Sequence, residues 1–466
     1  MARGKRNIAA VKYAEEDYET DEEKDLEKEE EEEQEEPKSK SRKLNEPSSD
    51  EKSNASGSIG KWSELFGRSL IQFVYDGFDV KKLSGGNGGS SSGSTGSSSS
   101  DSAKAIRSIK IAAFDFDSTL VSTKSGRAFA TGPTDWIVWD KSVAKKLKSA
   151  QDEGYLLVIF TNQNGIAKGK LTVAALKQRV EAFMRHVGTD LKFLVLAAPN
   201  EDHYRKPSIG MWEHLRDILL RGVEIDMKNS IYVGDAAGRP KDWIKGKKKD
   251  HSCGDRKFAL NIGIAFATPE GYFLGQKEYS KWTLQGYDVK TLQQVNKEPY
   301  KASDIISEKQ EVVLFVGFPA SGKSTFYKRY FQPNGYVHIN RDTLKTPAAC
   351  LKACNQALEE GKSVVVDNTN PDAASREPYI DAAKEHNVPV RCFRFSTDEE
   401  LSKHLNVYRE NSTQGAHKHV PTVAYNLYKK KFQEPKRSEG FSEIRTVDFV
   451  PVVSGDPNTH TFYHYT

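Results

Sequence analysis

The chain has 466 residues, enough for two or three domains, and its hydrophobic fraction of 37% is low for a wholly folded protein. No run of about 18 apolar residues occurs, so we expect no membrane-spanning helix, and we expect no secretory signal because no apolar stretch follows the basic first residues. The four cysteines are too few for a disulfide framework, so we expect a reducing compartment, and we expect Cys350 and Cys354 to be ordinary small buried residues.

Charge is distributed unevenly along the chain. Residues 1–57 contain 19 acidic and 11 basic residues, a net of −8, whereas the remaining residues contain 46 acidic and 58 basic residues, a net of +12. The acid block Glu29–Glu36 repels itself, so we predict that 1–57 is a disordered tail. The basic segment 38–43 fits a nuclear localisation patch or a plain basic linker. The basic remainder suits a polyanion such as nucleic acid, although an ordinary charged surface gives the same excess.

A first α/β domain is predicted over residues 58–280. Residues 58–83 are rich in apolar and aromatic side chains, and 84–102 are almost entirely Gly and Ser, which predicts a flexible insertion between two strands of one domain. Strands and helices then alternate, which is typical of a doubly wound parallel sheet. The predicted strands are 109–114, 156–160, 193–196 and 231–234, and the predicted helices lie around 141–150, 172–187 and 208–221.

Polar side chains follow these strands. Asp115 and Asp117 come directly after the first strand, Thr161 after the second, Lys206 in the loop after the third and Asp235 after the fourth. Two aspartates at a strand end are also a common turn, but the carboxyl ends of parallel strands meet in one crevice. One carboxylate there can attack a phosphate ester and a second can act as general acid and base. A lysine, a hydroxyl and Mg²⁺ would stabilise the phosphoryl group.

This order of residues resembles the haloacid dehalogenase superfamily. Its motifs are Asp-x-Asp-x-Thr/Val, a Thr or Ser after a second strand, a Lys, and a terminal acid. The resemblance implies that Asp115 is the nucleophile, Asp117 the general acid/base, Thr161 and Lys206 the phosphoryl ligands, and Asp115, Asp117 and Asp235 the magnesium ligands. Asp255, in Gly254–Ala259, is a candidate second acid of the last motif, and the sequence leaves its contribution open.

A second α/β domain is predicted over residues 311–466, after a linker at 281–310. The segment 311–316 predicts a strand, and Gly317–Ser324 behind it matches the P-loop pattern GxxxxGK[ST] and opens a helix. Further strands are predicted at 336–340, 363–367 and 390–396. The predicted fold class is therefore two doubly wound parallel-sheet domains after a disordered acidic tail.

The P-loop predicts a second phosphate site. Its backbone N–H groups would bind the ATP phosphates, Lys323 would reach the β- and γ-phosphates, and Ser324 would bind magnesium. The predicted ATP ligands of this loop are Gly317, Ala320, Ser321, Gly322, Lys323, Ser324 and Thr325. Asp342 could accept the proton of an attacking hydroxyl or cap the following helix. Arg376 and Arg409 could contact phosphates, or either could be a surface arginine.

A phosphatase ahead of a P-loop kinase resembles the family of eukaryotic polynucleotide kinase 3′-phosphatases of DNA strand-break repair. The matching stretches are 114–120, 125–127, 131–136, 160–163, 204–207, 233–240, 246–250, 317–319, 340–344 and 367–376. The resemblance covers roughly residues 60–83 and 103–450. It implies that Asp342 activates a 5′-hydroxyl, that Arg409 is a lid arginine near the ATP phosphates and that Arg376 lies near the phosphates.

The resemblance also implies an activity. A member of this family removes the 3′-phosphate from DNA and transfers the ATP γ-phosphate to a 5′-hydroxyl, with Mg²⁺ and ATP as cofactors. We therefore expect a monomeric enzyme of the nucleus that acts on DNA nicks, gaps and double-strand breaks, with strand-break repair factors as partners. Residues 1–57 are too short and charged for the forkhead-associated domain that many animal members carry. The alternatives are the same chemistry on RNA ends and a non-catalytic end-binding scaffold.

Overall fold

The structure is a computed structural model that describes residues 58–83, 108–293, 300–413, 417, 419–451 and 459–466. The tail predicted to be disordered, its basic segment and the Gly/Ser-rich insertion lie outside these residues. In the described part of the chain, no helix has the length and hydrophobicity needed to cross a membrane.

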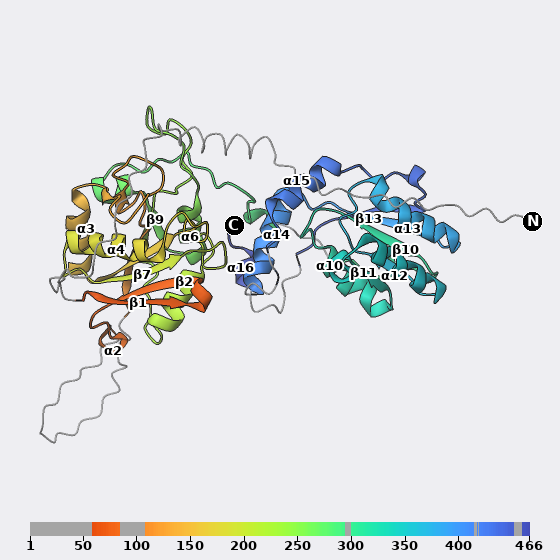
Figure 1. Ribbon diagram of the computed structural model, residues 1–466, viewed down its shortest axis with the longest axis horizontal. Helices are drawn as coiled ribbons and strands as arrows, with labels where there is room; N and C mark the ends of the chain where they lie inside the picture. The colour runs from red at the N-terminus through yellow and green to blue at the C-terminus, as the bar shows by residue number, and fades with distance from the viewer. Residues whose placement is uncertain (1–57, 84–107, 294–299, 414–416, 418, 452–458) are drawn as a thin grey trace, which may run out of the picture. The chain divides into compact units, whose positions relative to one another are not determined.

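The first α/β unit contains a seven-stranded sheet (Figure 1). Its strands are β1 (Gly60–Leu65), β2 (Leu70–Tyr75), β3 (Lys110–Phe114), β6 (Tyr155–Asn162), β7 (Phe193–Ala198), β8 (Ile231–Val233) and β9 (Ala265–Ala267). The spatial order is β1-β2-β7-β6-β3-β8-β9. The strands β7, β6, β3, β8 and β9 run parallel to one another, in line with the predicted parallel sheet. The sequence did not predict that β1 and β2 would extend this sheet as antiparallel strands. A separate small hairpin joins β4 (Val121–Ser122) and β5 (Ile137–Val138).

Helices cover both faces of this sheet (Figure 1). They are α2 (Val80–Leu83), α3 (Ser142–Asp152), α4 (Val173–Val187), α5 (Gly210–His214), α6 (Gly254–Ile262) and α7 (Pro269–Leu274). Alternate side chains of β3 enter opposite cores: Phe114 packs with α3, α4 and α7, and Ile111 packs with α5 and α6. The strand is thus buried on both faces, which explains its unbroken apolar sequence. The helix predicted at 208–221 is divided, because α5 continues as a wider π-helical turn at 215–219.

The second α/β unit contains a five-stranded parallel sheet in the order β11-β12-β10-β13-β14. Its strands are β10 (Val312–Val316), β11 (Val337–Ile339), β12 (Val364–Val366), β13 (Val390–Phe395) and β14 (Glu443–Val447). The helices after the first unit are α8 (Lys290–Gln293), α9 (Ala302–Ile305), α10 (Lys323–Phe326), α11 (Arg341–Leu344), α12 (Pro347–Glu359), α13 (Ala373–Glu385), α14 (Glu399–Ser412), α15 (Thr422–Lys431) and α16 (Thr459–Phe462). Leu314 packs towards α12 and α13, and Phe315 packs towards the aromatic residues after the P-loop. The predicted α/β class is confirmed for both units, whereas edge strand β14 was not predicted.

The segment predicted as a linker is partly built into the folded units. Trp282 stacks under the Arg256 guanidinium at 4.2 Å, and the Thr283 N–H donates to the Gly238 carbonyl at 3.0 Å. Further on, Ile305 is fully buried in the core of the second unit. Residues near both ends of 281–310 therefore belong to the packed structure.

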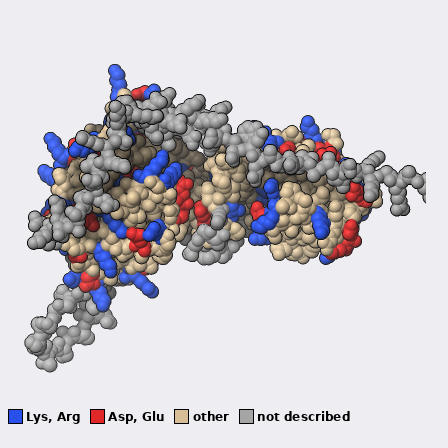
Figure 2. All heavy atoms as spheres, viewed as in Figure 1, with Lys and Arg blue, Asp and Glu red and all other residues tan. Residues whose placement is uncertain are grey.

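Charged side chains are interspersed on the visible part of the described surface. Figure 2 shows Lys and Arg alternating with Asp and Glu on this face, without one large patch of a single sign. On the face shown, the charged side chains of the described residues are therefore of mixed sign.

Candidate active sites

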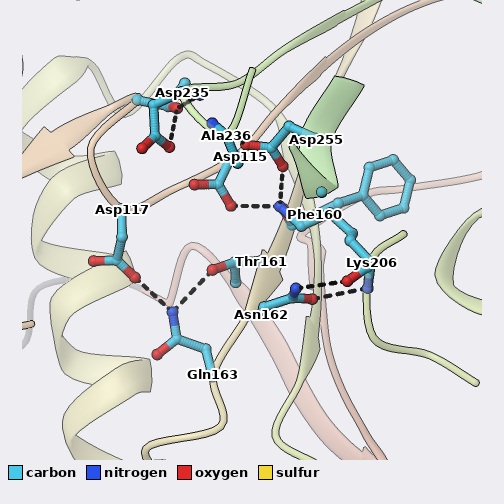
Figure 3. Close-up of polar contacts among 12 residues, drawn as sticks. Asp115, Asp117, Phe160, Thr161, Asn162, Gln163, Lys206, Asp235, Ala236 and Asp255 are labelled. Carbon is cyan, nitrogen blue, oxygen red and sulfur yellow. Dashed lines mark hydrogen bonds and ion pairs between the residues drawn. The ribbon is translucent and has the colours of Figure 1, made fainter. Parts of the chain in front are cut away.

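The first site forms where β3, β6 and β8 end side by side. Phe114 at the end of β3 pairs with Ile159 of β6 and with Val233 of β8. The next residue, Asp115, donates its backbone N–H to the Val233 carbonyl at 2.9 Å, which fixes its place at the sheet edge. Thr161, near the end of β6, is buried beside it. The register thus brings together the strand-end residues that the sequence predicted to converge (Figure 3).

Lys206 is the centre of the polar network in this site. Its Nζ lies 2.6 Å from Asp115 Oδ1, 2.8 Å from Asp255 Oδ1 and 2.8 Å from the Tyr232 hydroxyl. It also donates to the Phe160 carbonyl at 2.9 Å, and its side chain is only 3% exposed. Burial alone would lower the pKa of Lys206, but Asp115 and Asp255 outweigh it and raise that pKa. The ammonium group therefore keeps its charge next to the predicted nucleophile.

Asp255, which the sequence left open, is part of this network. It lies in the first turn of α6, where its Oδ2 accepts the Ala236 N–H at 3.0 Å and its Oδ1 accepts the Tyr232 hydroxyl at 3.0 Å. Gly234 makes the approach possible, because a Cβ at that position would lie 2.4 Å from Asp255 Oδ2. The carboxylate is thus held against the backbone after β8 and directed at Lys206.

Three carboxylates in this site fit a divalent cation. One oxygen from each of Asp115, Asp235 and Asp255 lies within 4.8 Å of the other two, and oxygen atoms are the ligands that Mg²⁺ prefers. Burial, aided by the neighbouring acids and opposed by Lys206, raises the pKa of Asp115 to about 7. Burial and the charges of Asp255 and Asp115 likewise raise the pKa of Asp235 well above its ordinary value. A cation bound between these buried carboxylates would stabilise their charged forms.

The Asp117 carboxylate is turned away from this cluster. Its Oδ1 accepts a hydrogen bond from Arg179 Nη2 at 2.5 Å, and its Oδ2 accepts one from Gln163 Nε2 at 2.7 Å. The same Gln163 amide donates to Thr161 Oγ1 at 2.8 Å, so it bridges the two side chains (Figure 3). Among the predicted metal ligands of this site, the structure groups Asp115 with Asp235 and leaves the Asp117 side chain outside.

The second site is the P-loop between β10 and α10. Ala320 and Gly322 have φ values of 57° and 94°, in the left-handed region that a tight turn of the loop requires. Glycine adopts this conformation at little cost. Ser324 Oγ donates to Asp367 Oδ2 at 2.6 Å, and Asp367 directly follows the neighbouring strand β12. His338 Nε2 lies 2.9 Å from the same oxygen, and its ring stacks on Tyr327. A buried carboxylate is thus held beside the hydroxyl predicted to bind magnesium.

Two other predicted residues act electrostatically on Lys323. Burial lowers the pKa of Lys323 to about 8, Asp367 and Asp342 oppose this shift, and Arg409 adds to it. Arg409 also has a buried Nε without a hydrogen-bond partner. The fold therefore brings Asp342 and Arg409 into the electrostatic neighbourhood of the P-loop lysine.

The structure shows whether Asp342 caps a helix and which groups Arg376 contacts. Asn340 caps α11 by accepting the N–H groups of Asp342 and Thr343, so the exposed Asp342 side chain is not the cap. Arg376 is fully buried, and its guanidinium pairs with Glu439 at 2.7 and 2.9 Å. It also donates to three backbone carbonyls, those of Asn370, Pro371 and Gln433. These contacts hold the Arg376 guanidinium within the fold, and its predicted contact with the ATP phosphates stays a prediction.

Several functional side chains were not identified from the sequence. Gln163 and Arg179 contact Asp117, Tyr232 contacts Lys206, and Asp367 contacts Ser324. A signal existed for Asp367, which ends a predicted strand in the way Asp115 does. Arg179 lies in the middle of a helix and gave no comparable signal.

Taken together, the two sites define a chain that joins an aspartate-based phosphatase to a P-loop kinase. The family model for polynucleotide kinase 3 phosphatase matches residues 110–273, and that for an AAA domain matches residues 312–349 and 343–435. The bifunctional polynucleotide phosphatase/kinase of Schizosaccharomyces pombe is 41% identical over 344 residues, which is 73% of this chain and 80% of that protein. The chain therefore belongs to the family of bifunctional polynucleotide phosphatase/kinases, and it is an enzyme.

Two further relatives match the phosphatase half. The polynucleotide 3′-phosphatase ZDP of Arabidopsis thaliana is 38% identical over 179 residues, 36% of this chain and 24% of that protein. A D-glycero-beta-D-manno-heptose-1,7-bisphosphate 7-phosphatase of Haemophilus ducreyi is 32% identical over 108 residues, 20% of this chain and 57% of that protein. These two relatives are named as phosphatases, and their names give different substrates.

Proposed function

We propose that this chain prepares the two ends of a broken DNA strand for ligation. It removes a 3′-phosphate at the first site and phosphorylates a 5′-hydroxyl with ATP at the second. The observation that supports the proposal is the presence in one chain of both phosphate-transfer sites: a carboxylate paired with a buried lysine, and a P-loop whose serine contacts a buried aspartate. The names of the relatives point to the same pair of activities.

The phosphatase reaction proceeds in two steps through a covalent intermediate. A carboxylate oxygen of Asp115 attacks phosphorus, the bond between phosphorus and O3′ breaks, and Asp117 gives its proton to O3′. Water then attacks the aspartyl-phosphate, Asp117 takes a proton from it, and the bond to Asp115 breaks to release inorganic phosphate. Lys206 and the Thr161 hydroxyl stabilise the phosphoryl oxygens during both steps.

Magnesium fits beside this reaction. Asp115 and Asp235 would hold the ion, and Asp255 would keep Lys206 in place, since its oxygens accept from Lys206, Tyr232 and the Ala236 N–H. When bound, Mg²⁺ supplies the positive charge that a phosphate needs among these carboxylates.

The kinase reaction needs a proton acceptor and a phosphate clamp. Asp342 accepts the proton of the 5′-hydroxyl as O5′ attacks the γ-phosphorus of ATP, and ADP leaves as the bond to the β-phosphate oxygen breaks. Lys323 holds the phosphates, and Ser324 with Asp367 would hold magnesium. Arg409 stabilises the charge that develops on the transferring group.

A nicked duplex with 3′-phosphate and 5′-hydroxyl termini tests the proposal. Asp115→Asn should abolish removal of the 3′-phosphate and spare 5′-phosphorylation, whereas Lys323→Ala should do the reverse, and a chelator should stop both. If both variants keep both activities, the assignment of the sites is wrong. A competition between matched DNA and RNA oligonucleotides tests whether the enzyme prefers deoxyribose or ribose ends. Faster turnover of RNA ends would overturn the DNA assignment.

We also propose that the enzyme acts in the nucleus as a monomer, together with other strand-break repair factors. A DNA substrate and the basic segment 38–43 support the nuclear location. A fluorescent fusion with the four basic residues of that segment changed to Ala should lose nuclear enrichment. Unchanged enrichment would show that this segment is only a basic linker.

A further inference from the structure

Arg179 is a buried cation in contact with a predicted catalytic carboxylate. It projects from α4, and its side chain is 1% exposed, whereas the Asp117 side chain with which it pairs is 40% exposed. The pair therefore has one end inside the fold and one end open to solvent. A substrate can reach Asp117 but cannot reach Arg179.

The surroundings of Arg179 hold it in one place. Leu176, Val180 and Phe183 of the same helix are fully buried in the core against the sheet, and Thr172 caps the helix by accepting the Ala175 N–H. The guanidinium also lies 5.3 Å from the centre of the Phe116 ring. Since its Nε is buried without a hydrogen-bond partner, the contact with Asp117 is the charge-assisted bond that compensates this cation.

Asp117 is held from two sides. Arg179 binds Oδ1, and Gln163 binds Oδ2 while also binding the Thr161 hydroxyl. These contacts fix the rotamer of Asp117 relative to the residue proposed to hold the phosphoryl group. An exposed aspartate without such contacts would rotate freely, and catalysis by a proton donor depends on its geometry.

We propose that Arg179 is a positioning residue of the phosphatase, which holds the Asp117 carboxylate where it can deliver a proton to the leaving oxygen and later accept one from water. The inference rests on the proposed role of Asp117. Arg179 touches neither substrate nor phosphate, and it exchanges no proton. Its effect on the reaction is carried entirely by the orientation of Asp117.

The dependence on the leaving group distinguishes positioning from a structural role. An oligonucleotide 3′-phosphate leaves as an alkoxide that needs the proton, whereas p-nitrophenyl phosphate leaves as a phenolate that needs it much less. In Arg179→Gln, kcat on the oligonucleotide should fall by about 10- to 100-fold with little change in KM. On p-nitrophenyl phosphate, the first turnover should keep near wild-type speed and give a nitrophenol burst of about one per active site, followed by slow turnover because hydrolysis of the intermediate needs the base.

Three comparisons complete the experiment, all in the full chain with 5′-kinase activity as the internal measure of folding. Arg179→Lys keeps a cation and should recover part of the lost kcat. Arg185→Gln, on the same helix with a side chain 33% exposed and its carboxylate partner Glu181 3.8 Å away, should leave both activities unchanged. Asp117→Asn should show the burst more strongly than Arg179→Gln.

The outcomes separate the two proposals. If Asp117→Asn shows no leaving-group dependence, the proposed role of Asp117 fails, and the inference fails with it. If Asp117→Asn behaves as expected but Arg179→Gln lowers the burst rate and the steady-state rate equally, Arg179 has only a structural role. If Arg179→Gln lowers neither rate, Arg179 has no role in the reaction. Either result overturns this inference alone. Should Arg179→Gln lose its fold, the same comparison in Arg179→Lys decides.

Discussion

The space at Gly234 gives the sharpest prediction for the phosphatase site. A Cβ there would lie 2.4 Å from Asp255 Oδ2, and ordinary contact begins at 3.4 Å. Because the other near atoms also belong to Asp255, Gly234→Ala must push that side chain back by about 1 Å. The Asp255 contact with Lys206, now 2.8 Å, would then exceed hydrogen-bond distance.

The cost of this shift can be put in numbers. A misplacement of about 1 Å near a reacting centre costs about 100-fold in rate, which is about 2.7 kcal/mol of transition-state stabilisation. We therefore expect kcat of the 3′-phosphatase to fall by about two orders of magnitude in Gly234→Ala, measured on a 3′-phosphate oligonucleotide. The kinase activity of the same molecules should not change.

A matched glycine provides the control. A Cβ at Gly132 would meet no atom within 4 Å, and its backbone is not left-handed, so Gly132→Ala should keep phosphatase activity. Gly234→Ala and Asp255→Asn remove the same contact with Lys206. The phosphatase kcat of the double variant should therefore be little lower than that of the less active single variant. If Gly234→Ala keeps kcat within about twofold, the placement of Asp255 against Lys206 does not govern catalysis.

Three further predictions concern the kinase. Because burial lowers the pKa of Lys323 to about 8, the lysine is charged below that pH, and the affinity of the free enzyme for ATP should weaken as pH rises from 7 to 9 in equilibrium titrations. A flat profile would contradict this. Asp367→Asn removes the charge beside Ser324 and should lower kinase kcat/KM by about 100-fold or more while sparing the phosphatase, and a variant rescued by high magnesium would support the site. Arg376→Ala removes the guanidinium hydrogen bonds to Glu439, whose carboxylate keeps the Lys436 N–H, so it should destabilise the kinase unit by about 3–5 kcal/mol in denaturant unfolding without changing KM for ATP. A raised KM at unchanged stability would instead support the predicted phosphate contact.

Local pattern was sufficient for the central parallel strands of both units, although it did not predict how β1, β2 and β14 extend the sheets. The run before Asp115 is apolar because β3 is buried on both faces, and the polar residue that follows it marks the sheet edge. The same logic located Thr161, Lys206 and Asp235, and the P-loop pattern located Lys323 and Ser324. The positions of residues at strand ends and in the P-loop were therefore predictable from local sequence. The contact of Arg376 with Glu439 was not predictable, because an arginine near a motif looks the same in the sequence whether it binds phosphate or a carboxylate.

The sequence by itself determined the order of the two chemistries and the residues that stand at strand ends. Only the tertiary structure decided how those residues are held: Arg179 reaches Asp117 across 62 positions, and Asp255 reaches Lys206 across 49. Such contacts depend on how a helix packs on a sheet and on whether a glycine leaves room, and neither leaves a periodic signature in the chain. The position of the proposed nucleophile follows from its strand, but the orientation of the side chains around it follows from packing.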